Sequence, residues 1–220
     1  MTPSATINWT LAESPTVFII DDDPSIRSLL ELLISHSGRR CISFENAAEF
    51  LEAYDPRRPG CVLSDILMPG MSGLDLQNEL NRRGATVPVI FISAQGDVPT
   101  AVVAMRHGAF DFLLKPFSDQ DLLNRVAAAL ARDQEIRLSL SEVDQVRTRL
   151  DRLTPREHEV LKLIVAGRSN KAMSDDLALS IRTVELHRAR VMEKMRVKSV
   201  AQLVRMIMEA QGPQQPAAPH

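Results

Sequence analysis

The stretch Val17-Phe18-Ile19-Ile20-Asp21-Asp22 decides the fold, because it joins a short apolar run to two adjacent carboxylates. Short apolar runs bounded by turn signals predict strands that are buried on both faces of a parallel sheet. Three further runs also end in a polar side chain: Asp65 after residues 61–63, Ser93 after residues 89–92 and Lys115 after residues 112–114. In an open α/β sheet, functional groups lie beyond the carboxyl ends of the strands. The pattern therefore predicts a metal-assisted phosphoryl site.

Helix-like stretches separate the apolar runs, which predicts five β/α units. Strands are expected near residues 17–20, 40–44, 61–65, 89–93 and 110–114, and helices are expected to begin near Pro24, Asn46, Ser72, Val98 and Ser118. This alternation favours a doubly wound sheet with right-handed crossovers. We expect an α/β domain with a flavodoxin-like, five-stranded parallel sheet in the order 2-1-3-4-5.

The two halves of the chain differ in charge. Residues 15–128 carry 15 acidic and 10 basic side chains, whereas residues 153–210 carry 7 acidic and 11 basic ones. Two domains with different partners are therefore expected, and nucleic acid is the expected partner of the second. The predicted boundaries are a disordered extension at 1–14, the α/β domain at 15–128, a helical linker at 129–152, the basic domain at 153–210 and a disordered tail at 211–220.

Composition also limits the location of the protein. No apolar stretch is long enough to cross a bilayer, and residues 1–14 lack the basic start and apolar run of a signal peptide. We therefore expect a cytoplasmic protein with no membrane partner. Cys41 and Cys61 fall in predicted strands without metal-ligand spacing, so we expect buried free thiols rather than a disulfide or a metal site.

The acidic run after the first strand has two interpretations. Adjacent like charges at Asp21 and Asp22 are unfavourable unless a cation relieves them, and Mg²⁺ takes oxygen ligands. A strand end followed by a helix would also explain the run, with Asp23 as the N-cap and Pro24 as the first helical residue. Asp23 is expected to serve only as that cap.

Together with this acidic pair, the segment DILMPGMSG (residues 65–73), Ser93-Ala94 and Lys115-Pro116 resemble the receiver domain of two-component response regulators. The resemblance covers roughly residues 15–128. It implies that Asp65 accepts a phosphoryl group from a phosphohistidine on a partner sensor histidine kinase. It also implies a Mg²⁺ ion held by Asp22, Asp65 and the backbone carbonyl of Leu67, with Asp21 placing a metal-bound water.

These residue types suit phosphoryl transfer. A carboxylate is a competent covalent acceptor, and transfer through a loose transition state depends mainly on positioning and charge neutralisation. Lys115 and Mg²⁺ would supply positive charge, and in the family the peptide bond before Pro116 is typically cis. The same resemblance implies a switch in which the Ser93 hydroxyl moves to bond the phosphoryl group and Phe112 rotates into the vacated space. Core packing is an equally good account of Phe112.

The last helix of the α/β domain has no predicted stop, because residues 119–150 contain neither Gly nor Pro. Ile136, Leu140, Val143 and Leu150 keep four-three spacing, with Arg147 in the missing place. This spacing favours either a short coiled-coil seam in a dimer or a solvated helical linker.

The basic domain is predicted to be all-α, with four helices. Their signals are Thr154 as N-cap with Pro155 following, Gly167 as the end of the first helix, a second helix over about 170–177, Ser180 as the N-cap of a third helix reaching Met195, and a fourth over about 199–210. A short helix, a tight turn and a longer helix are typical of a helix-turn-helix.

The segments LTPREHEVL (residues 153–161), TVELH (183–187) and EKM (193–195) resemble the DNA-binding domain of the NarL/FixJ (LuxR-type) regulators. On the third helix, Val184, Val191 and Met195 are expected to face the core, and the opposite face is expected to meet DNA. The candidates for base edges are Thr183, Glu185 and Leu186, and those for phosphates are Arg182, His187, Arg188, Arg190 and Lys194. Glu185 stands where relatives often have lysine and can accept a hydrogen bond from cytosine N4. His187 can also be read as a partly buried structural histidine.

Together these features predict a transcriptional regulator, not an enzyme, whose DNA binding is controlled by phosphorylation. We expect a homodimer when phosphorylated, an approximate inverted repeat as the operator, and RNA polymerase as a further candidate partner. The sequences of residues 93–98 and 110–117 resemble the FixJ branch of the family. This resemblance implies that the receiver dimer forms through residues 98–114. One alternative is a Mg²⁺-dependent phosphatase of the haloacid-dehalogenase type with Asp21 as nucleophile, which leaves the Asp65 segment unexplained. The other is an interaction module that ignores phosphorylation.

Overall fold

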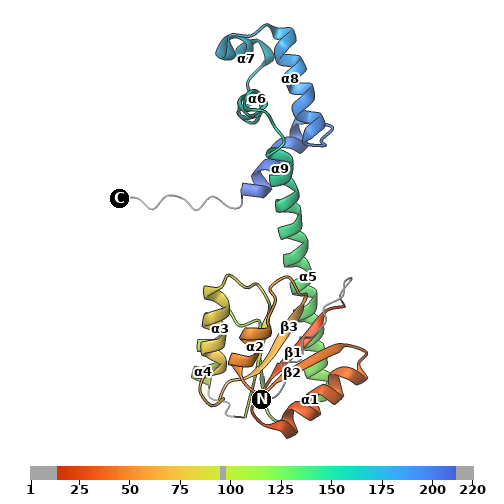
Figure 1. The fold of residues 1–220 in the computed structure, drawn as a ribbon, viewed down its shortest axis with the longest axis vertical. Coiled ribbons are helices and arrows are strands. Elements are labelled where there is room, and N and C mark those ends of the chain that lie inside the picture. The colour runs from red at the N-terminus through yellow and green to blue at the C-terminus, as the bar shows by residue number, and fades with distance from the viewer. Residues whose placement is uncertain (1–13, 95–97, 212–220) are drawn as a thin grey trace, which may run out of the picture. The chain divides into compact units, whose positions relative to one another are not determined.

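The structure, a computed structural model, describes residues 14–94 and 98–211, and the chain divides into two compact units between Ile136 and Arg137. The predicted disordered ends, 1–14 and 211–220, fall almost entirely outside the described residues. The first unit and the helix that leaves it contain, in order, β1 (Thr16–Ile20), α1 (Pro24–His36), β2 (Arg40–Phe44), α2 (Ala47–Ala53), β3 (Gly60–Asp65), α3 (Gly73–Arg82), β4 (Val89–Ser93), α4 (Val98–Arg106), β5 (Asp111–Leu114) and α5 (Asp119–Leu150) (Figure 1).

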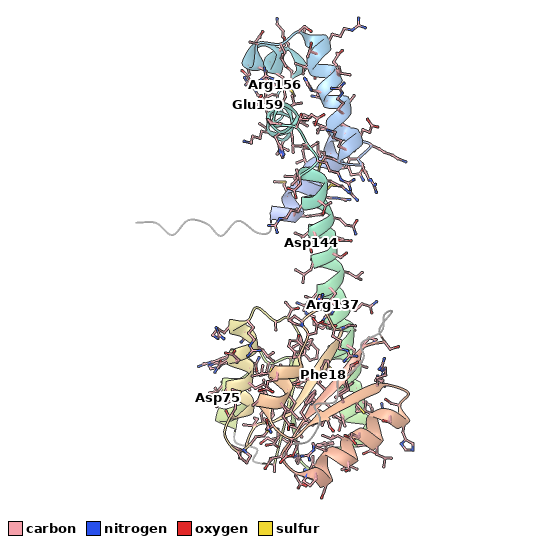
Figure 2. The ribbon with its side chains drawn as sticks, viewed as in Figure 1. Phe18, Asp75, Arg137, Asp144, Arg156 and Glu159 are labelled. Atoms are coloured by element: carbon pink, nitrogen blue, oxygen red, sulfur yellow. The ribbon has the colours of Figure 1, made fainter. Side chains whose placement is uncertain are left out.

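The sheet has the predicted order, β2-β1-β3-β4-β5, and every neighbouring pair is parallel. Successive residues of a strand point to opposite faces, so β1 supplies both layers of the core. Val17 and Ile19 pack with α1 and α5 on one face, whereas Phe18 and Ile20 pack with α2, α3 and α4 on the other. Figure 2 labels Phe18 within the first unit. The buried strands therefore bring their polar carboxyl ends to one edge of a rigid sheet.

Local signals in the sequence define where these helices begin. The Asp23 carboxylate accepts a hydrogen bond from the Ser25 N–H at 2.8 Å and caps α1, and Pro24 is the first helical residue. At α3, the Ser72 hydroxyl and the Asp75 carboxylate form a capping box. Capping residues are preferred there because the first helical N–H groups have no partner within the helix.

Both cysteines are free, as predicted, but only Cys61 is fully buried. Burial, with a smaller contribution from the charge of Asp133, raises the pKa of the Cys61 thiol to about 12. The expectation that Cys41 is buried is wrong: it lies on β2, an edge strand, and is partly exposed.

The second unit is built from α6 (Pro155–Val165), α7 (Asn170–Leu177), α8 (Ile181–Lys194) and α9 (Val200–Gln211), together with the last turns of α5. The predicted helix starts are present: Thr154 and Ser180 cap α6 and α8. Val184, Val191 and Met195 are fully buried, as their spacing predicts.

The two halves of α5 belong to different units. In the first half, Ala129 lies in the core of the first unit, and the Asp133 carboxylate accepts a hydrogen bond from the Gly60 N–H at 2.9 Å. In the second half, Val146 and Leu150 pack in the core of the second unit. Leu150 of the proposed coiled-coil seam is therefore used within its own chain, whereas Leu140 is half exposed. Among the described residues, no helix is both long and apolar enough to cross a membrane.

Candidate functional site

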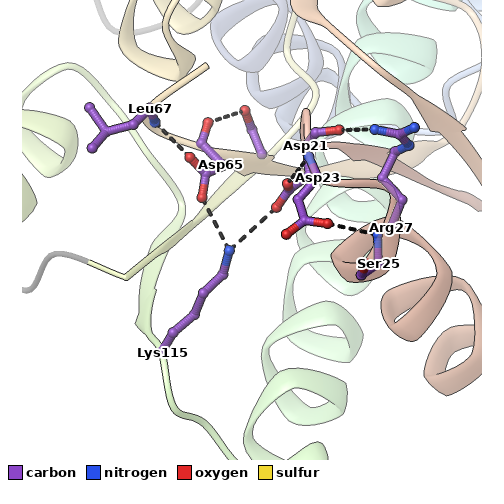
Figure 3. Close-up of polar contacts among 8 residues, drawn as sticks. Asp21, Asp23, Ser25, Arg27, Asp65, Leu67 and Lys115 are labelled. Atoms are coloured by element: carbon purple, nitrogen blue, oxygen red, sulfur yellow. Dashed lines mark hydrogen bonds and ion pairs between the residues drawn. The ribbon is translucent and has the colours of Figure 1, made fainter. Parts of the chain in front are cut away.

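Three strands place an ammonium between two carboxylates at the carboxyl edge of the sheet. Asp21 follows β1, Asp65 ends β3 and Lys115 follows β5. The Lys115 Nζ lies 3.2 Å from Asp65 Oδ1 and 3.4 Å from Asp21 Oδ2 (Figure 3). The side chains therefore meet, as the sequence predicts, and one ammonium is shared by two carboxylates, which leaves a net negative charge at this edge of the sheet.

Asp21 is the deep member of this cluster, with 2 % of its surface exposed. Its Oδ1 accepts a hydrogen bond from the Asp23 N–H at 2.9 Å. Burial raises the pKa of the Asp21 carboxyl, and the Asp23 N–H and the Lys115 charge only partly oppose that effect. Its backbone carbonyl accepts a hydrogen bond from Arg27 Nη1 at 2.6 Å, so α1 also holds this residue in place. No sequence motif pointed to Arg27.

Asp65 is the accessible member, and its orientation is fixed from both sides. Its Oδ2 accepts the Leu67 N–H at 2.6 Å, while its Oδ1 faces Lys115. Gly73 packs directly against the backbone of Asp65: a Cβ at this glycine would lie 2.3 Å from the Asp65 carbonyl oxygen and 2.9 Å from a ring carbon of Phe91. A side chain at position 73 would therefore displace the end of β3, which explains the glycine.

Lys115 and Ser93 are joined through the backbone. The Lys115 N–H donates to the Ser93 carbonyl at 2.8 Å, and the Lys115–Pro116 peptide bond is cis, as expected. Ser93 is 3 % exposed at the end of β4, and Phe112 is half-buried on the neighbouring strand β5, against the core. The two residues named for the switch therefore sit on paired strands beside the acidic cluster.

The donor set at this edge fits a hard cation that keeps its water. Asp22 is exposed and lines an open groove of about 290 Å³ with Glu45, Asn46 and the loop around Pro69. Across residues 14–94 and 98–211, no three acidic, thiol or imidazole side chains form a complete metal cluster. Magnesium is usually bound through one or two carboxylates and retains several waters, so an incomplete protein shell is the expected arrangement.

In the second unit, α7 and α8 form the helix-turn-helix, and the outward face of α8 is basic. Arg182, Leu186, Ala189, Arg190 and Glu193 are exposed, as the spacing predicts, and Leu186 keeps 50 % of its surface in solvent. Glu185 is exposed beside them. An exposed leucine among charges is suited to contact an apolar group such as a thymine methyl.

The remaining candidates of α8 are more constrained. The Thr183 hydroxyl shares a hydrogen bond of 2.8 Å with the capping Ser180 hydroxyl. Arg188 and His187 are half-buried, and the His187 Nδ1 is buried with no hydrogen-bond partner among the described residues. The structural interpretation of His187 therefore gains support from its burial.

Lys194 is half-buried and is paired with a buried carboxylate of its own unit. Its Nζ donates to Glu157 at 2.6 Å and to the Arg152 carbonyl at 3.1 Å. Burial would raise the pKa of Glu157, but the Lys194 ammonium and the hydrogen bonds from Thr154 outweigh it and lower that pKa to about 2. The predicted phosphate contact of Lys194 would require it to leave this pair. Arg149 adds a second link, because its Nη1 donates to the Met195 carbonyl at 3.2 Å.

Replacing Lys194 with Ala should destabilise the second unit by about 2 kcal/mol, because it leaves the buried Glu157 carboxylate without its cation, while solvent still reaches the partly exposed lysine side of the pair. Hydrogen exchange on the full chain should show amides of α6 and α8 opening about 30-fold more often. The matched control is Lys162→Ala, which removes an exposed lysine from α6. Equal protection of these amides in Lys194→Ala and Lys162→Ala would contradict a stabilising role for the pair of Lys194 and Glu157.

The same pair predicts a pH dependence. The pKa of Glu157 lies near 2 in the fold against an ordinary value of 4.5, so its stabilisation is complete above about pH 4.5 and is lost as the pH falls toward 2. The opening free energy of α6 should therefore fall over this window in the native sequence and fall less in Glu157→Gln.

Comparison with known proteins finds one family match in each of the two units. Residues 17–127 match the model of the response regulator receiver domain, and residues 151–207 match that of bacterial regulatory proteins of the luxR family. The chain is 44 % identical to the transcriptional regulatory protein FixJ of Azorhizobium caulinodans, over 91 % of this chain and 95 % of that protein. It is 42 % identical to nodulation protein W of Bradyrhizobium diazoefficiens, over 86 % and 84 %. Among solved structures, the response regulator StyR matches with a TM-score of 0.81 and 39 % identity, over 89 % of this chain and 98 % of that one.

Proposed function

The chain belongs to the response regulators that join a receiver domain to a LuxR-type DNA-binding domain, and on this premise we propose that Asp65 is its phosphoacceptor. The protein is a phosphorylation-controlled transcriptional regulator. The contact of 3.2 Å between Lys115 Nζ and Asp65 Oδ1 carries the assignment. Of the two carboxylates that contact Lys115, Asp65 is the more exposed, with 13 % of its side chain exposed against 3 % for Asp21.

Each pocket residue has a separate role in phosphoryl transfer. Asp65 accepts the phosphoryl group from a phosphohistidine of a sensor histidine kinase, and the Leu67 N–H fixes the plane of its carboxylate. Lys115 neutralises charge that develops on the transferred oxygens. Bound Mg²⁺ would add positive charge there, held by Asp22, Asp65 and the Leu67 carbonyl, with Asp21 placing a metal-bound water. The acceptor role requires no further enzymatic activity.

The switch is proposed to run from Ser93 to Phe112. The Ser93 hydroxyl moves toward the phosphoryl oxygens, and the Phe112 ring turns into the space beside β4. Support comes from their places on adjacent strands and from the partial exposure of Phe112, which leaves the ring room to turn.

The partners follow from the exposed surfaces. Apolar side chains of α4 and β5 are exposed on the receiver and are proposed to form the homodimer after phosphorylation: Val102, Val103, Met105 and Leu114. Two paired helix-turn-helix units would read an approximate inverted repeat of double-stranded DNA in the cytoplasm. RNA polymerase is the proposed further partner of the DNA-bound dimer.

Selection from random DNA with the full chain tests this function. With Mg²⁺ and acetyl phosphate as the phosphoryl donor, we expect enrichment of an approximate inverted repeat and about tenfold tighter binding than without the donor, within the usual range of allosteric coupling. The base contacts come from the exposed face of α8, whose candidates are Thr183, Glu185 and Leu186, with Arg182, Arg188 and Arg190 on phosphates. Affinity that ignores the donor would contradict control by the receiver.

A further inference from the structure

An acidic side chain stands unneutralised on the basic face of α8. Glu185 is exposed three residues away from both Arg182 and Arg188, and side chains at this spacing on a helix are neighbours. Nevertheless, the described residues show no ion pair between Glu185 and either arginine. Instead, the Nδ2 of Asn170 donates a hydrogen bond to Glu185 Oε1 at 3.4 Å. Within the described residues, the side-chain contact of Glu185 is therefore with the neighbouring helix and not with its own.

The position of the Asn170 amide is set by the packing of α7. Asn170 is the first residue of that helix, directly after Ser169, whose hydroxyl accepts the Ala172 N–H at 3.2 Å. Met173 of α7 and Val184 of α8 are both fully buried in one core, which fixes the two helices against each other. This packing fixes the backbone of Asn170 relative to α8 and brings its amide within hydrogen-bond reach of Glu185 Oε1, while Oε2 can still accept a further hydrogen bond.

Such an oriented carboxylate distinguishes the four bases. An ionised carboxylate is an acceptor only. In the major groove, cytosine presents the N4 amino donor, guanine presents the N7 and O6 acceptors, thymine presents the O4 acceptor, and adenine sets an acceptor beside its donor. A fixed acceptor on α8 is thus complementary to cytosine and opposed to guanine and thymine.

We propose that Asn170 is a specificity-determining residue that holds Glu185 toward the base edges, so that each half-site carries a cytosine at the position facing Glu185. Without the amide, the flexible glutamate side chain swings toward Arg182 or Arg188 and loses its defined contact. The inference rests on the proposed function, because it requires α8 to enter the major groove.

Selection from random DNA with the full, donor-treated chain tests this pair. The native protein should prefer cytosine at the Glu185 position by about tenfold, and Asn170→Ala should reduce this preference below about threefold at that position alone. Glu185→Gln should shift the preference to adenine, because glutamine pairs with adenine N6 and N7. Lys171→Ala, a change at an exposed neighbour on α7, should leave every base preference unchanged. Because Glu185 is exposed, Glu185→Gln should fold normally and still measure the base preference even if Asn170→Ala lowers stability.

The outcomes separate the inference from the function on which it rests. If the native chain enriches an inverted repeat but both variants keep its preferences at all positions, the role of Asn170 and Glu185 is wrong and DNA binding through α8 stands. If Asn170→Ala weakens binding equally at every base, Asn170 has a structural role only and the inference is overturned. If the native chain enriches no sequence, the proposed function fails first.

Discussion

The Asp65→Asn variant should take up no phosphoryl group from acetyl phosphate and should bind DNA with the same affinity whether or not the donor is present. An amide lacks the anionic oxygen that forms the acyl phosphate bond, whereas its size and shape match those of the carboxylic acid. The side-chain oxygen can still accept the Leu67 N–H, but the amide NH2 then faces Lys115 and that one contact is lost, while the shape of the pocket should be retained.

The measurement is phosphoryl incorporation by intact-protein mass, followed by DNA affinity with and without the donor. Asp119→Asn is the matched control, because it changes an exposed aspartate in the first turn of α5 and should incorporate as the native chain does. Incorporation into Asp65→Asn at the native level would contradict the assignment. Incorporation at Asp21 in that variant would favour the phosphatase-type alternative, which the family comparisons do not support.

The Lys115→Ala variant should be labelled roughly 100-fold more slowly, in line with the loss of one preorganised positive group at a site of developing charge. In the folded chain this ammonium contacts both Asp65 and Asp21, so its removal also leaves two neighbouring carboxylates without a shared cation. The rate should fall while the labelled residue stays the same.

Initial rates of labelling at saturating Mg²⁺ would measure this effect. Arg57→Ala removes one positive charge from an exposed loop of the same unit and controls for net charge alone. Lys115→Arg keeps the charge but replaces a compact ammonium with a planar group, and it should recover only part of the rate. Equal rates for Lys115→Ala and the native chain would show that the contact plays no part in transfer.

Local sequence signals predicted most of the fold because each depends on a few neighbouring residues. The start of α1 at Pro24 and the caps Ser72, Thr154 and Ser180 follow from unsatisfied helix termini. The strand order also follows, because parallel β/α units of this length allow few arrangements. The convergence of Asp21, Asp65 and Lys115 then required only the rule that polar strand ends share one edge of the sheet.

The features that the sequence did not predict join residues far apart in the chain. Lys194 binds Glu157 across 37 positions, and the Asp133 carboxylate binds the Gly60 N–H across 73 positions. Helical periodicity places Lys194 on α8 but cannot show that α6 offers it a buried carboxylate. The bond from Asn170 to Glu185 likewise depends on how two helices pack. Tertiary packing determines such pairs, and the spacing of residues along one helix cannot predict them.

The location of the phosphoryl group tests the central claim most directly. After treatment with acetyl phosphate and Mg²⁺, the acyl phosphate is trapped by borohydride reduction and the modified residue is identified by peptide mass spectrometry. We predict that the modification lies on Asp65, and that Asp65→Asn carries none. A modification on Asp21 or on any other side chain, or an unmodified native chain that still responds to the donor, would contradict the account.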